Sequence, residues 1–476
     1  MKFCLVSASP NEGLDEREKN KSIAAFPPLS LLYLASALKI NDVEVSVLDQ
    51  PGQGLTVNET VDWVMKENPD VLGFSALSTS GKTAALISSK VKERNPNITT
   101  VLGNHYATFN AHRILKRYPS VDVIVRGEGE KTITQLADCL KHNDPLSNVL
   151  GINYRNNHDI VSTPDQPLIK NLDALPFPDR KLINVDYHCM IAGANVAPKK
   201  FTSMVSSRGC VYSCRFCSCT EFAHNVWRAR SAQNTLEELE LLVSEGYKQL
   251  IFVDDNFTLN PKRTIEICKG MIKEKMDFQW ICEGRVDNCS SELLKAMVKA
   301  GLKILYFGIE NANQRILDYF NKTITPQQAE TAVKTARKAG VDVIVSSFIV
   351  GAQDETRQEI QNTLNFAKRL PIELPQFNIL CAHPGNGIWN EMESKGFLNA
   401  DEDWETGVAV SKICPTAVPY EEIKQMIHKA FMEHVRRPSY LLRQVGLTLQ
   451  SSYRMNVVAS NITRISDIIE GTSSVT

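Results

Sequence analysis

The chain has 476 residues, a length that fits two or three domains at about 150 residues each. Lysine and arginine number 53 against 54 aspartate and glutamate, so the formal net charge is −1 and no basic excess points to nucleic acid as a partner. The fractions of hydrophobic residues (43%) and charged residues (22%) are typical of a globular chain rather than a disordered one. No apolar run is long enough for a transmembrane segment.

Twelve cysteines and no recognisable signal peptide predict reduced thiols and a cytoplasmic protein. A disulfide framework is the disfavoured interpretation, because such frameworks belong to small secreted chains.

Residues 1–141 alternate strand-like and helix-like segments. Strands that alternate with helices predict an α/β domain with a doubly wound, Rossmann-like, mostly parallel sheet. Ligands of such sheets bind beyond the carboxyl ends of the strands. The expected strands cover 2–7, 43–49, 70–76, 98–103 and 121–127, and helical spacing covers 29–39, 57–67 and 81–94.

Residues 142–200 lose this rhythm and are rich in Asn, Asp and Pro, which indicates a connector with some small strands. A second strand–helix series fills 201–392, and the tail, 393–476, is predicted to be helical, with its clearest amphipathic stretch at 420–435. The second series has six expected strands, at 201–207, 249–255, 278–284, 303–310, 341–351 and 376–382. Six strand–helix units are two short of a closed barrel, so we expect a partial (β/α) barrel with its functional groups on the loops that follow the strands.

The sharpest motif is SSRGCVYSCRFCSC, at 206–219, directly after the first strand of the second series. Cys210, Cys214 and Cys217 have the spacing C-x3-C-x2-C. Three thiolates on one loop can each bind one iron of a four-iron cluster and leave the fourth iron open to an outside ligand. A structural zinc site would take four ligands, usually in two separated pairs, so zinc is disfavoured. Cys219 is extra, and we expect a nearby free thiol rather than a ligand.

This loop resembles that of the radical S-adenosylmethionine (SAM) superfamily in its spacing, in its position after the first barrel strand and in the strand–helix series that follows. The resemblance implies a 4Fe–4S cluster on the three cysteines, with SAM bound to the fourth iron. Phe216 occupies the aromatic place at which family members contact adenine.

Later strand ends also resemble this superfamily and supply further polar groups for one pocket. Arg285 is expected to pair with the methionyl carboxylate, and Glu310 or Asp255 to take the ammonium group or the ribose hydroxyls. Gly351 lies in FIVGAQDET (348–356), which resembles the family's glycine-rich turn but departs from it at Gln353 and Asp354. Each of these groups alone could equally cap a loop.

The first domain resembles the cobalamin-binding domain that precedes the barrel in one large radical-enzyme subfamily. The motifs are FPPLSLLYLASAL (26–38), GFSALSTS (73–80), VLGNHYATF (101–109) and VRGEGE (125–130), and RRPSYLL (436–442) in the tail agrees. Small or hydroxylated residues at strand ends would let the backbone approach a broad corrin. The expected contacts are Ser75, Ser78, Thr79, Gly103, His105, Thr108, Gly127 and Glu128.

The sequence contains no D-x-H-x-x-G, the motif whose histidine ligates cobalt in other cobalamin proteins. We therefore expect that cobalamin binds without a histidine as an axial ligand of its cobalt. For His105 we expect a hydrogen-bonding or structural role. The alternative is a plain doubly wound domain that binds a nucleotide or nothing.

The resemblance implies a cobalamin-dependent radical SAM methyltransferase. A 5′-deoxyadenosyl radical would remove hydrogen from an unactivated carbon, and methylcobalamin would supply the methyl group. A low-potential electron donor of the flavodoxin or ferredoxin type is implied. The residues identify neither a catalytic side chain nor the substrate, which is a small molecule, a lipid or a peptide.

Two alternatives remain open, a cyclase or rearrangement enzyme and a sensor, and a third, a methylthiotransferase, is disfavoured. A cobalamin-dependent cyclase or rearrangement enzyme would share the architecture. A methylthiotransferase would need a second cluster, but the first domain holds only Cys4 and Cys139. A non-catalytic cobalamin or redox sensor would not need the full set of polar strand ends.

Overall fold

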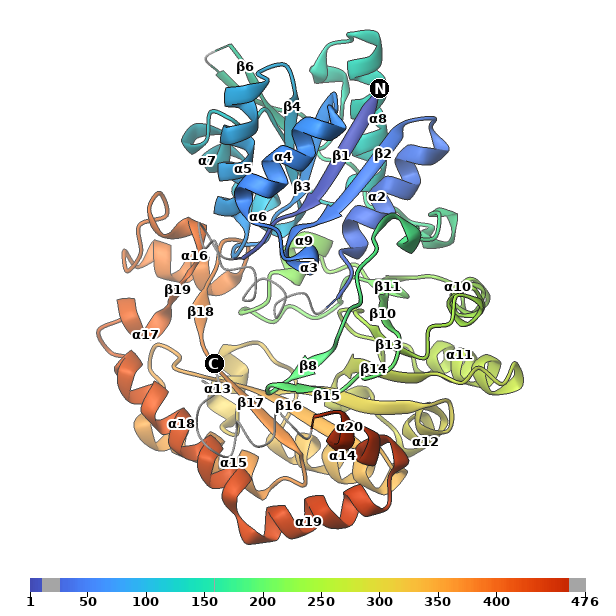
Figure 1. Ribbon diagram of the computed structural model, residues 1–476. Helices are drawn as coiled ribbons and strands as arrows, with labels where there is room; N and C mark the ends of the chain where they lie inside the picture. Colours follow the sequence, from blue (N-terminus) through green and yellow to red (C-terminus); the bar gives the residue numbers. More distant parts are fainter. Residues whose placement is uncertain (11–25, 158, 462–476) are drawn as a thin grey trace.

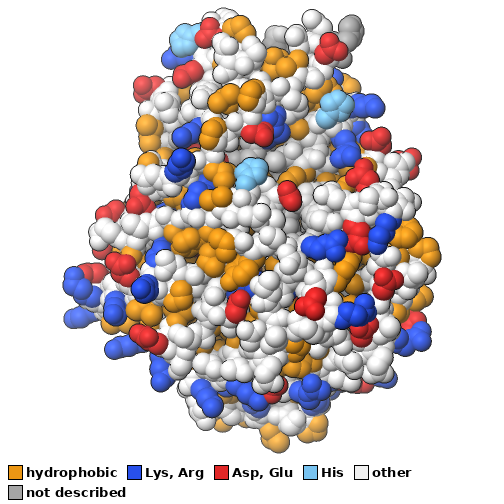
Figure 2. All heavy atoms as spheres, turned by 180° about the vertical axis from the view of Figure 1, so that it is seen from behind, with side chains coloured by type: hydrophobic (Ala, Val, Ile, Leu, Met, Phe, Trp, Pro, Cys, Tyr) orange, Lys and Arg blue, Asp and Glu red, His pale blue; other side chains and the backbone are white. Residues whose placement is uncertain are grey.

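Two parallel β-sheets with helices packed against them make up most of the molecule, the amino-terminal one above and the second one below in Figure 1. The computed structural model describes residues 1–10, 26–157 and 159–461. The last 15 residues of the predicted helical tail, 462–476, lie outside the described residues. On the face shown in Figure 2, both acidic and basic side chains are present.

The first sheet has seven strands in the spatial order β2-β1-β3-β4-β5-β6-β7. The first five pair in parallel, and β6 and β7 add an antiparallel edge. The strands are β1 (Lys2–Ser7), β2 (Glu44–Asp49), β3 (Val71–Ser75), β4 (Thr99–Gly103), β5 (Val123–Val125), β6 (Ile152–Asn156) and β7 (Asp159–Ser162). This confirms the predicted doubly wound α/β sheet. The two edge strands come from the range that the sequence assigns to the connector.

Helices cover both faces of this sheet, because its inner strands are apolar on both sides. They are α2 (Leu29–Ile40), α3 (Gln50–Gln53), α4 (Val57–Glu67), α5 (Gly81–Arg94), α6 (Asn104–Phe109), α7 (Ala111–Arg117) and α8 (Gly129–His142). A capping box of Thr56 and Glu59 starts α4. The strand order reverses between β1 and β3, and this is where sheets of this kind bind ligands.

The second sheet has six parallel strands in the order β10-β13-β14-β15-β16-β17, which confirms the partial barrel. The strands are β10 (Phe201–Met204), β13 (Gln249–Phe252), β14 (Gln279–Gly284), β15 (Leu302–Glu310), β16 (Val343–Val350) and β17 (Leu374–Ile379). The helices between them are α10 (Ala232–Ser244), α11 (Pro261–Lys273), α12 (Ser291–Lys299), α13 (Gln314–Tyr319), α14 (Pro326–Ala339) and α15 (Arg357–Arg369).

Short elements and the tail complete the molecule. They are β8 (Met190–Ile191), β9 (Ala194–Asn195), β11 (Ser207–Arg208), α9 (Cys219–Ala223), β12 (Arg228–Ala229), β18 (Cys381–Ala382), α16 (Gly387–Ser394), β19 (Val408–Ala409), α17 (Val410–Ile413), α18 (Tyr420–Arg436), α19 (Pro438–Leu449) and α20 (Ser452–Ser460). In the part of the chain that the structure describes, no helix is both long and apolar enough to cross a membrane.

The barrel opens toward the first domain. On its inner face, Ile251, Ile281, Ile304 and Val345 are buried in one apolar cluster with Tyr453 of α20. This cluster fills the middle of the barrel, so the carboxyl ends of the strands are left as the open end, and they face the carboxyl ends of the first sheet (Figure 1). Both predicted ligand-binding edges therefore meet at the junction of the two domains.

The tail contains a histidine whose titration should make the corner between α18 and α19 acid-labile. His434 is fully buried against Tyr440, with ring centroids 4.9 Å apart. Burial, and then the charges of Arg437 and Arg443, lower its pKa to about 4. The unfolded chain takes up this proton near its ordinary pKa of about 6.5, so stability is lost as the pH falls from about 6.5 toward 4. At about 1.4 kcal/mol per pKa unit, the loss is on the order of 3 kcal/mol.

Urea unfolding and hydrogen exchange of α18 and α19 at pH 7 and pH 4.5 would measure this loss. His434→Gln, which cannot titrate, should show a clearly smaller difference between the two pH values. An equal difference in both proteins would contradict the assignment to His434.

Candidate active site

The three motif cysteines lie on the loop that follows β10 and β11, at the open end of the barrel. Cys214 is buried, and Cys210 and Cys217 are half-buried. Burial raises the pKa of the Cys210 and Cys214 thiols. A hydrogen bond from Cys219 lowers the pKa of Cys217 to about 7.

The surroundings of this loop fit an anionic, thiolate-bound group. Arg285 Nη1 lies 3.9 Å from Cys214 Sγ, and the charge of Lys322 also acts on this thiol. Within the described ranges, no three His, Cys, Asp or Glu side chains come together closely enough to hold a single metal ion. Three separated thiols beside two cations suit an iron–sulfur cluster better than one zinc ion.

Two neighbouring aspartates after β13 have different environments. Asp254 is buried and accepts hydrogen bonds from Ser206 N at 2.8 Å and Ser206 Oγ at 2.7 Å, so it holds the backbone before the cysteine loop. Asp255 Oδ2 accepts one from Gly209 N at 2.7 Å, and its side chain lines the cavity between the domains. Of the two, Asp255 is therefore the one available to a ligand.

Arg285 and Glu310 are buried and already paired. Arg285 forms two hydrogen bonds of 3.0 Å with Asp287 and lies 3.5 Å from the centroid of the Tyr212 ring. Glu310 has a left-handed backbone (φ 68°), and its Oε1 accepts a hydrogen bond from Lys322 Nζ at 2.8 Å. Both side chains are thus held rigidly beside the cysteine loop.

Phe216 lies on the cysteine loop after β11, and Gly351 directly follows β16. The Phe216 ring packs edge-on against Phe320, with centroids 5.4 Å apart. Gly351 has φ 87°, a conformation that favours glycine, and its N–H donates to Glu355 Oε2 at 2.6 Å. Glu355, the acidic residue at the end of the predicted turn, is thus hydrogen-bonded within the turn, although Gln353 and Asp354 are unusual for the family.

Two charged residues of this site carry no motif and were missed in the sequence. Lys322 has no local signal, because it pairs with Glu310 across twelve residues. Glu283 lies on β14 opposite Tyr306, with the buried neighbours Cys282 and Gly284 on the other face. Desolvation by the surrounding barrel, and then the charges of Asp255 and Glu310, raise the pKa of Glu283. Strict alternation along the strand would have placed Glu283 on the inner face.

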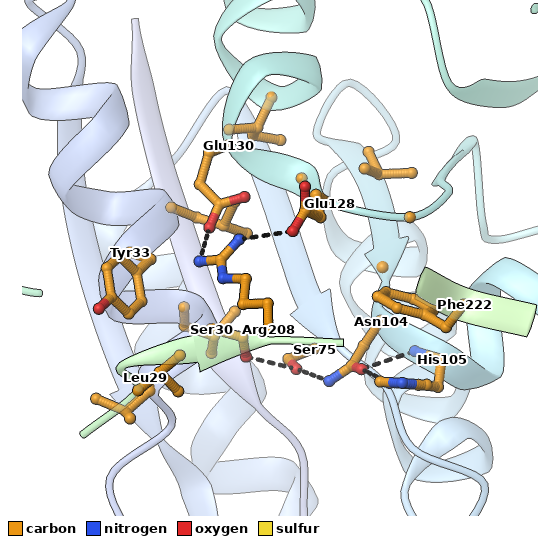
Figure 3. A pocket seen from close by; sticks show the side chains of 18 of the residues that line it. Leu29, Ser30, Tyr33, Ser75, Asn104, His105, Glu128, Glu130, Arg208 and Phe222 are labelled. Carbon is orange, nitrogen blue, oxygen red and sulfur yellow. Dashed lines mark hydrogen bonds and ion pairs between the residues drawn. The ribbon is translucent and has the colours of Figure 1, made fainter. Parts of the chain in front are cut away.

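A cavity of about 290 Å³ lies between the two domains (Figure 3). Most of its lining is apolar, and it reaches from the strand ends of the first sheet to the cysteine loop of the second domain. Of the predicted cobalamin contacts, the cavity wall contains Ser75, Gly103, His105, Gly127 and Glu128. The wall does not include Ser78, Thr79 or Thr108, and Thr108 Oγ1 instead accepts a hydrogen bond from Gly127 N at 3.0 Å.

The cavity contains residues that the sequence analysis did not single out individually. They are Leu5, Leu29, Ser30, Leu31, Tyr33, Leu34, Phe74, Val101, Asn104, Val125, Gly129, Glu130, Ile133, Arg208, Phe222 and Arg228, among others. The stretch from Leu29 to Leu34 lies within the motif FPPLSLLYLASAL, so the motif had marked the segment but not the side chains. Arg208 lies within the cysteine motif at 206–219, whereas Phe222 and Arg228, also from the second domain, lie outside every motif that the sequence offers.

A chain of hydrogen bonds orders one wall of the cavity. It runs from Ser30 Oγ to Ser75 Oγ (3.0 Å), then to Asn104 Nδ2 (2.8 Å), and Asn104 Oδ1 contacts His105 Nδ1 at 2.7 Å. The His105 ring stacks on Phe222 of α9, with centroids 3.9 Å apart (Figure 3). Burial lowers the pKa of His105, which favours the neutral ring.

The backbone at two strand ends leaves room for a broad ligand. A Cβ built on Gly127 would meet nothing within 4 Å, and one built on Gly103 would come no closer than 3.7 Å to any neighbour. Open backbone beside an apolar cavity fits a large planar group such as a corrin.

Two family models match the chain. The model described as "Radical SAM superfamily" matches residues 204–367, and the one described as "B12 binding domain" matches residues 22–137. An uncharacterized methyltransferase of Pyrococcus horikoshii is 34% identical over 421 residues, which cover 88% of this chain and 90% of that protein. The anaerobic magnesium-protoporphyrin IX monomethyl ester cyclase of Rubrivivax gelatinosus is 29% identical over 78% of this chain and 67% of its own length.

A solved structure has the same fold. The radical S-adenosylmethionine methyltransferase TsrM from Kitasatospora setae, with cobalamin and a 4Fe–4S cluster bound, superposes with a TM-score of 0.68 at 15% identity. The match covers 83% of this chain and 75% of that chain. At this identity the likeness concerns the fold.

Proposed function

This chain belongs to the family of cobalamin-binding radical S-adenosylmethionine proteins, and on that premise we propose that it is a methyltransferase acting on an unactivated carbon of its substrate. The observation that carries the proposal is that the interdomain cavity and the site of the three motif cysteines share one wall. Gly209, Cys219 and Asp255 line the cavity of the first domain and lie next to the three motif cysteines. Two cofactors held on either side of this wall would both face one substrate.

In this proposal Cys210, Cys214 and Cys217 hold a 4Fe–4S cluster, and SAM lies beside it. Arg285, kept in place by Asp287 and Tyr212, presents a guanidinium group to the methionyl carboxylate. Asp255 and Glu310 offer carboxylates to the ammonium group and the ribose. Phe216 and Gly351 are proposed to contact the adenine and its ribose.

Cobalamin is proposed to bind in the interdomain cavity, against Ser75, Gly103, His105 and Gly127. Glu128, which the sequence predicts as a further contact, lies in the same wall, but both of its carboxylate oxygens are paired with arginines. Ser78, Thr79 and Thr108 would support the same loops from outside the wall. The leucines of α2 and the valines of β4 and β5 offer an apolar slot for the cofactor's nucleotide tail. When bound, the three cofactors supply radical hydrogen abstraction and methyl donation, and the chain supplies their placement.

The chain also provides an apolar floor below the open end of the barrel. Apolar side chains fill the middle of the barrel, as the cluster of Ile251, Ile281, Ile304, Val345 and Tyr453 shows. A substrate in the open end would therefore lie between this apolar floor and the cofactors above it.

The partners and the compartment follow from this chemistry. We place the enzyme in the cytoplasm, because all twelve cysteines are unpaired thiols and a reducing compartment keeps them so. A flavodoxin or ferredoxin would be the electron donor. The substrate is a small molecule, a lipid or a peptide.

Ring formation is the second candidate, favoured by the 29% identity to the cyclase of Rubrivivax gelatinosus. A cyclase would use the same cluster and cavity but would not leave a new methyl group on its product. Product mass therefore separates the two functions.

Anaerobic reconstitution with iron, sulfide and cobalamin, followed by incubation of a cell extract with deuterated-methyl SAM and a low-potential reductant, tests the proposal. Mass spectrometry should find a product that carries one deuterated methyl group, together with 5′-deoxyadenosine. A product that has lost hydrogen but carries no deuterated methyl group would indicate the cyclase. A protein that binds cobalamin but never cleaves SAM would be a sensor, and that result would contradict both enzymatic functions.

A further inference from the structure

The ribbon of β11 and β12, at the junction of the two domains, places two arginines opposite each other. Its antiparallel register pairs Arg208 with Arg228. Like charges directly opposite in an antiparallel pair destabilise it. This two-stranded ribbon therefore needs an anion between its arginines.

The first domain supplies that anion as Glu128. Its Oε1 lies 3.2 Å from Arg208 Nη1, and its Oε2 lies 2.8 Å from Arg228 Nη1. Glu130 adds a second contact, with its Oε1 2.6 Å from Arg208 Nη2, and Arg208 reaches between the two carboxylates in Figure 3. The Glu128 side chain is only 6% exposed. Burial would raise the pKa of Glu128, but Arg228 and Arg208 bring it below its ordinary value, so the carboxylate is ionised.

The same carboxylate also holds the connector. Ile169 N donates to Glu128 Oε2 at 2.8 Å, and Ile169 O accepts from Arg228 Nη1 at 2.8 Å. Glu128 is the residue before α8, where the amino end of the helix favours a negative charge. One side chain thus joins the first domain, the connector and the barrel.

The ribbon transmits its position directly to the cysteine loop. Arg208 is followed by Gly209 and then by Cys210. Gly209 has φ 83°, and a Cβ on it would lie 2.2 Å from Val226 O, so this link has little freedom to adjust. Gly209 N is also held by Asp255. A shift of Arg208 would therefore move Cys210.

We propose that Glu128 is a positioning residue, a clamp that sets the distance between the cobalamin cavity and the cluster loop by bridging Arg208 and Arg228. The proposal rests on the function proposed above and replaces the cobalamin contact that the sequence predicts for Glu128. With both oxygens on arginines, Glu128 acts on the cofactors through the ribbon rather than by touching them.

Hydrogen exchange of the reconstituted holoenzyme tests the clamp in Glu128→Gln, which keeps the shape and removes the charge. Amides of residues 205–212 and 226–231 should exchange at least about tenfold faster, because Arg228 loses its carboxylate partner and Arg208 keeps only Glu130. Pulsed electron paramagnetic resonance of cob(II)alamin and the reduced cluster should show a broader spread of distances between them. The affinity for cobalamin should stay within about threefold. Asp165→Asn, which breaks an exposed pair with Arg126, is the matched control and should change none of these.

A double-mutant cycle with Arg228→Gln guards against a variant that merely folds badly. In the Arg228→Gln background the like-charge pair is gone, so Glu128→Gln should accelerate exchange at least about threefold less than in the wild type. Unchanged exchange and an unchanged distance spread in Glu128→Gln, with cobalamin affinity lowered about 100-fold, would overturn the proposal and make Glu128 a cobalamin ligand. These measurements need no turnover, so a failure to find methylation would leave their result intact, and their failure would leave the methylation test intact.

Discussion

Replacing Cys210, Cys214 and Cys217 together by alanine is expected to abolish iron binding by the reconstituted protein. The three thiols are the cluster ligands in this proposal, and a cubane without thiolate ligation from its loop is not retained. The visible absorption of the cluster and the magnetic signal of its reduced state should both disappear. SAM cleavage should fall to background, because the cluster supplies the electron that cleaves SAM in this proposal.

Cys219→Ala is the matched control for this triple variant. Cys219 lies two residues beyond Cys217 and donates a hydrogen bond to it, so the variant perturbs the same loop without removing a ligand. Four irons per chain should remain. A full cubane in the triple variant would sink the assignment of the cluster, and loss of iron in Cys219→Ala would show that Cys219 is a ligand.

The positions of the strands could be predicted from the sequence because parallel strands with helices on both sides are continuous apolar runs. KFCLVS became β1 (Lys2–Ser7), and the helical spacing at 81–94 became α5 (Gly81–Arg94). Such signals are local, since each depends on a few neighbouring residues. The same holds for the C-x3-C-x2-C loop, whose spacing lies within eight residues.

The partners of the site residues could not be predicted, because they depend on contacts between distant segments. Glu128 pairs with Arg208 across 80 positions, and nothing near Glu128 in the sequence indicates an arginine. From VRGEGE the sequence therefore predicts Gly127 and Glu128 as cobalamin contacts, but it does not predict the pairing of Glu128 with arginines. The stack of His105 on Phe222 likewise joins two domains, and it explains how His105 can be ordered without a metal.

The edge of the first sheet shows the same limit. Residues 142–200 have the composition of a connector, yet β6 pairs antiparallel with β5 and carries the sheet beyond residue 141. An edge strand that is half polar has no continuous apolar run, so its composition alone does not separate it from a loop.

Gly103→Trp is expected to weaken cobalamin binding by at least about 100-fold, or about 2.7 kcal/mol. The nearest atoms to a Cβ at this position belong to Val125, at 3.7 and 3.8 Å, so the first carbon fits. The indole beyond it must enter the cavity, where overlap with a corrin cannot be relieved without moving the sheet. Cobalamin titration followed by absorption would measure the loss, with cluster iron content as the check on folding.

Gly103→Ala provides the matched control, because its single added carbon makes ordinary van der Waals contact. Its affinity should stay within about threefold of the wild type, well below the tenfold that 1.4 kcal/mol represents. Equal affinities in the tryptophan variant and the wild type would place cobalamin outside this cavity.

His105→Ala separates a wall residue from a cobalt ligand in the same cavity. His105 Nδ1 already contacts Asn104 Oδ1 at 2.7 Å, and the ring is stacked on Phe222, so we expect the loss of about one buried hydrogen bond, 1–3 kcal/mol. Electron paramagnetic resonance of the cob(II)alamin form gives a readout that is independent of affinity. A ligated histidine splits the cobalt lines through its nitrogen, and this splitting would vanish in His105→Ala. We expect no such splitting in the wild type, because the Asn104 contact and the Phe222 stack hold the ring in the cavity wall.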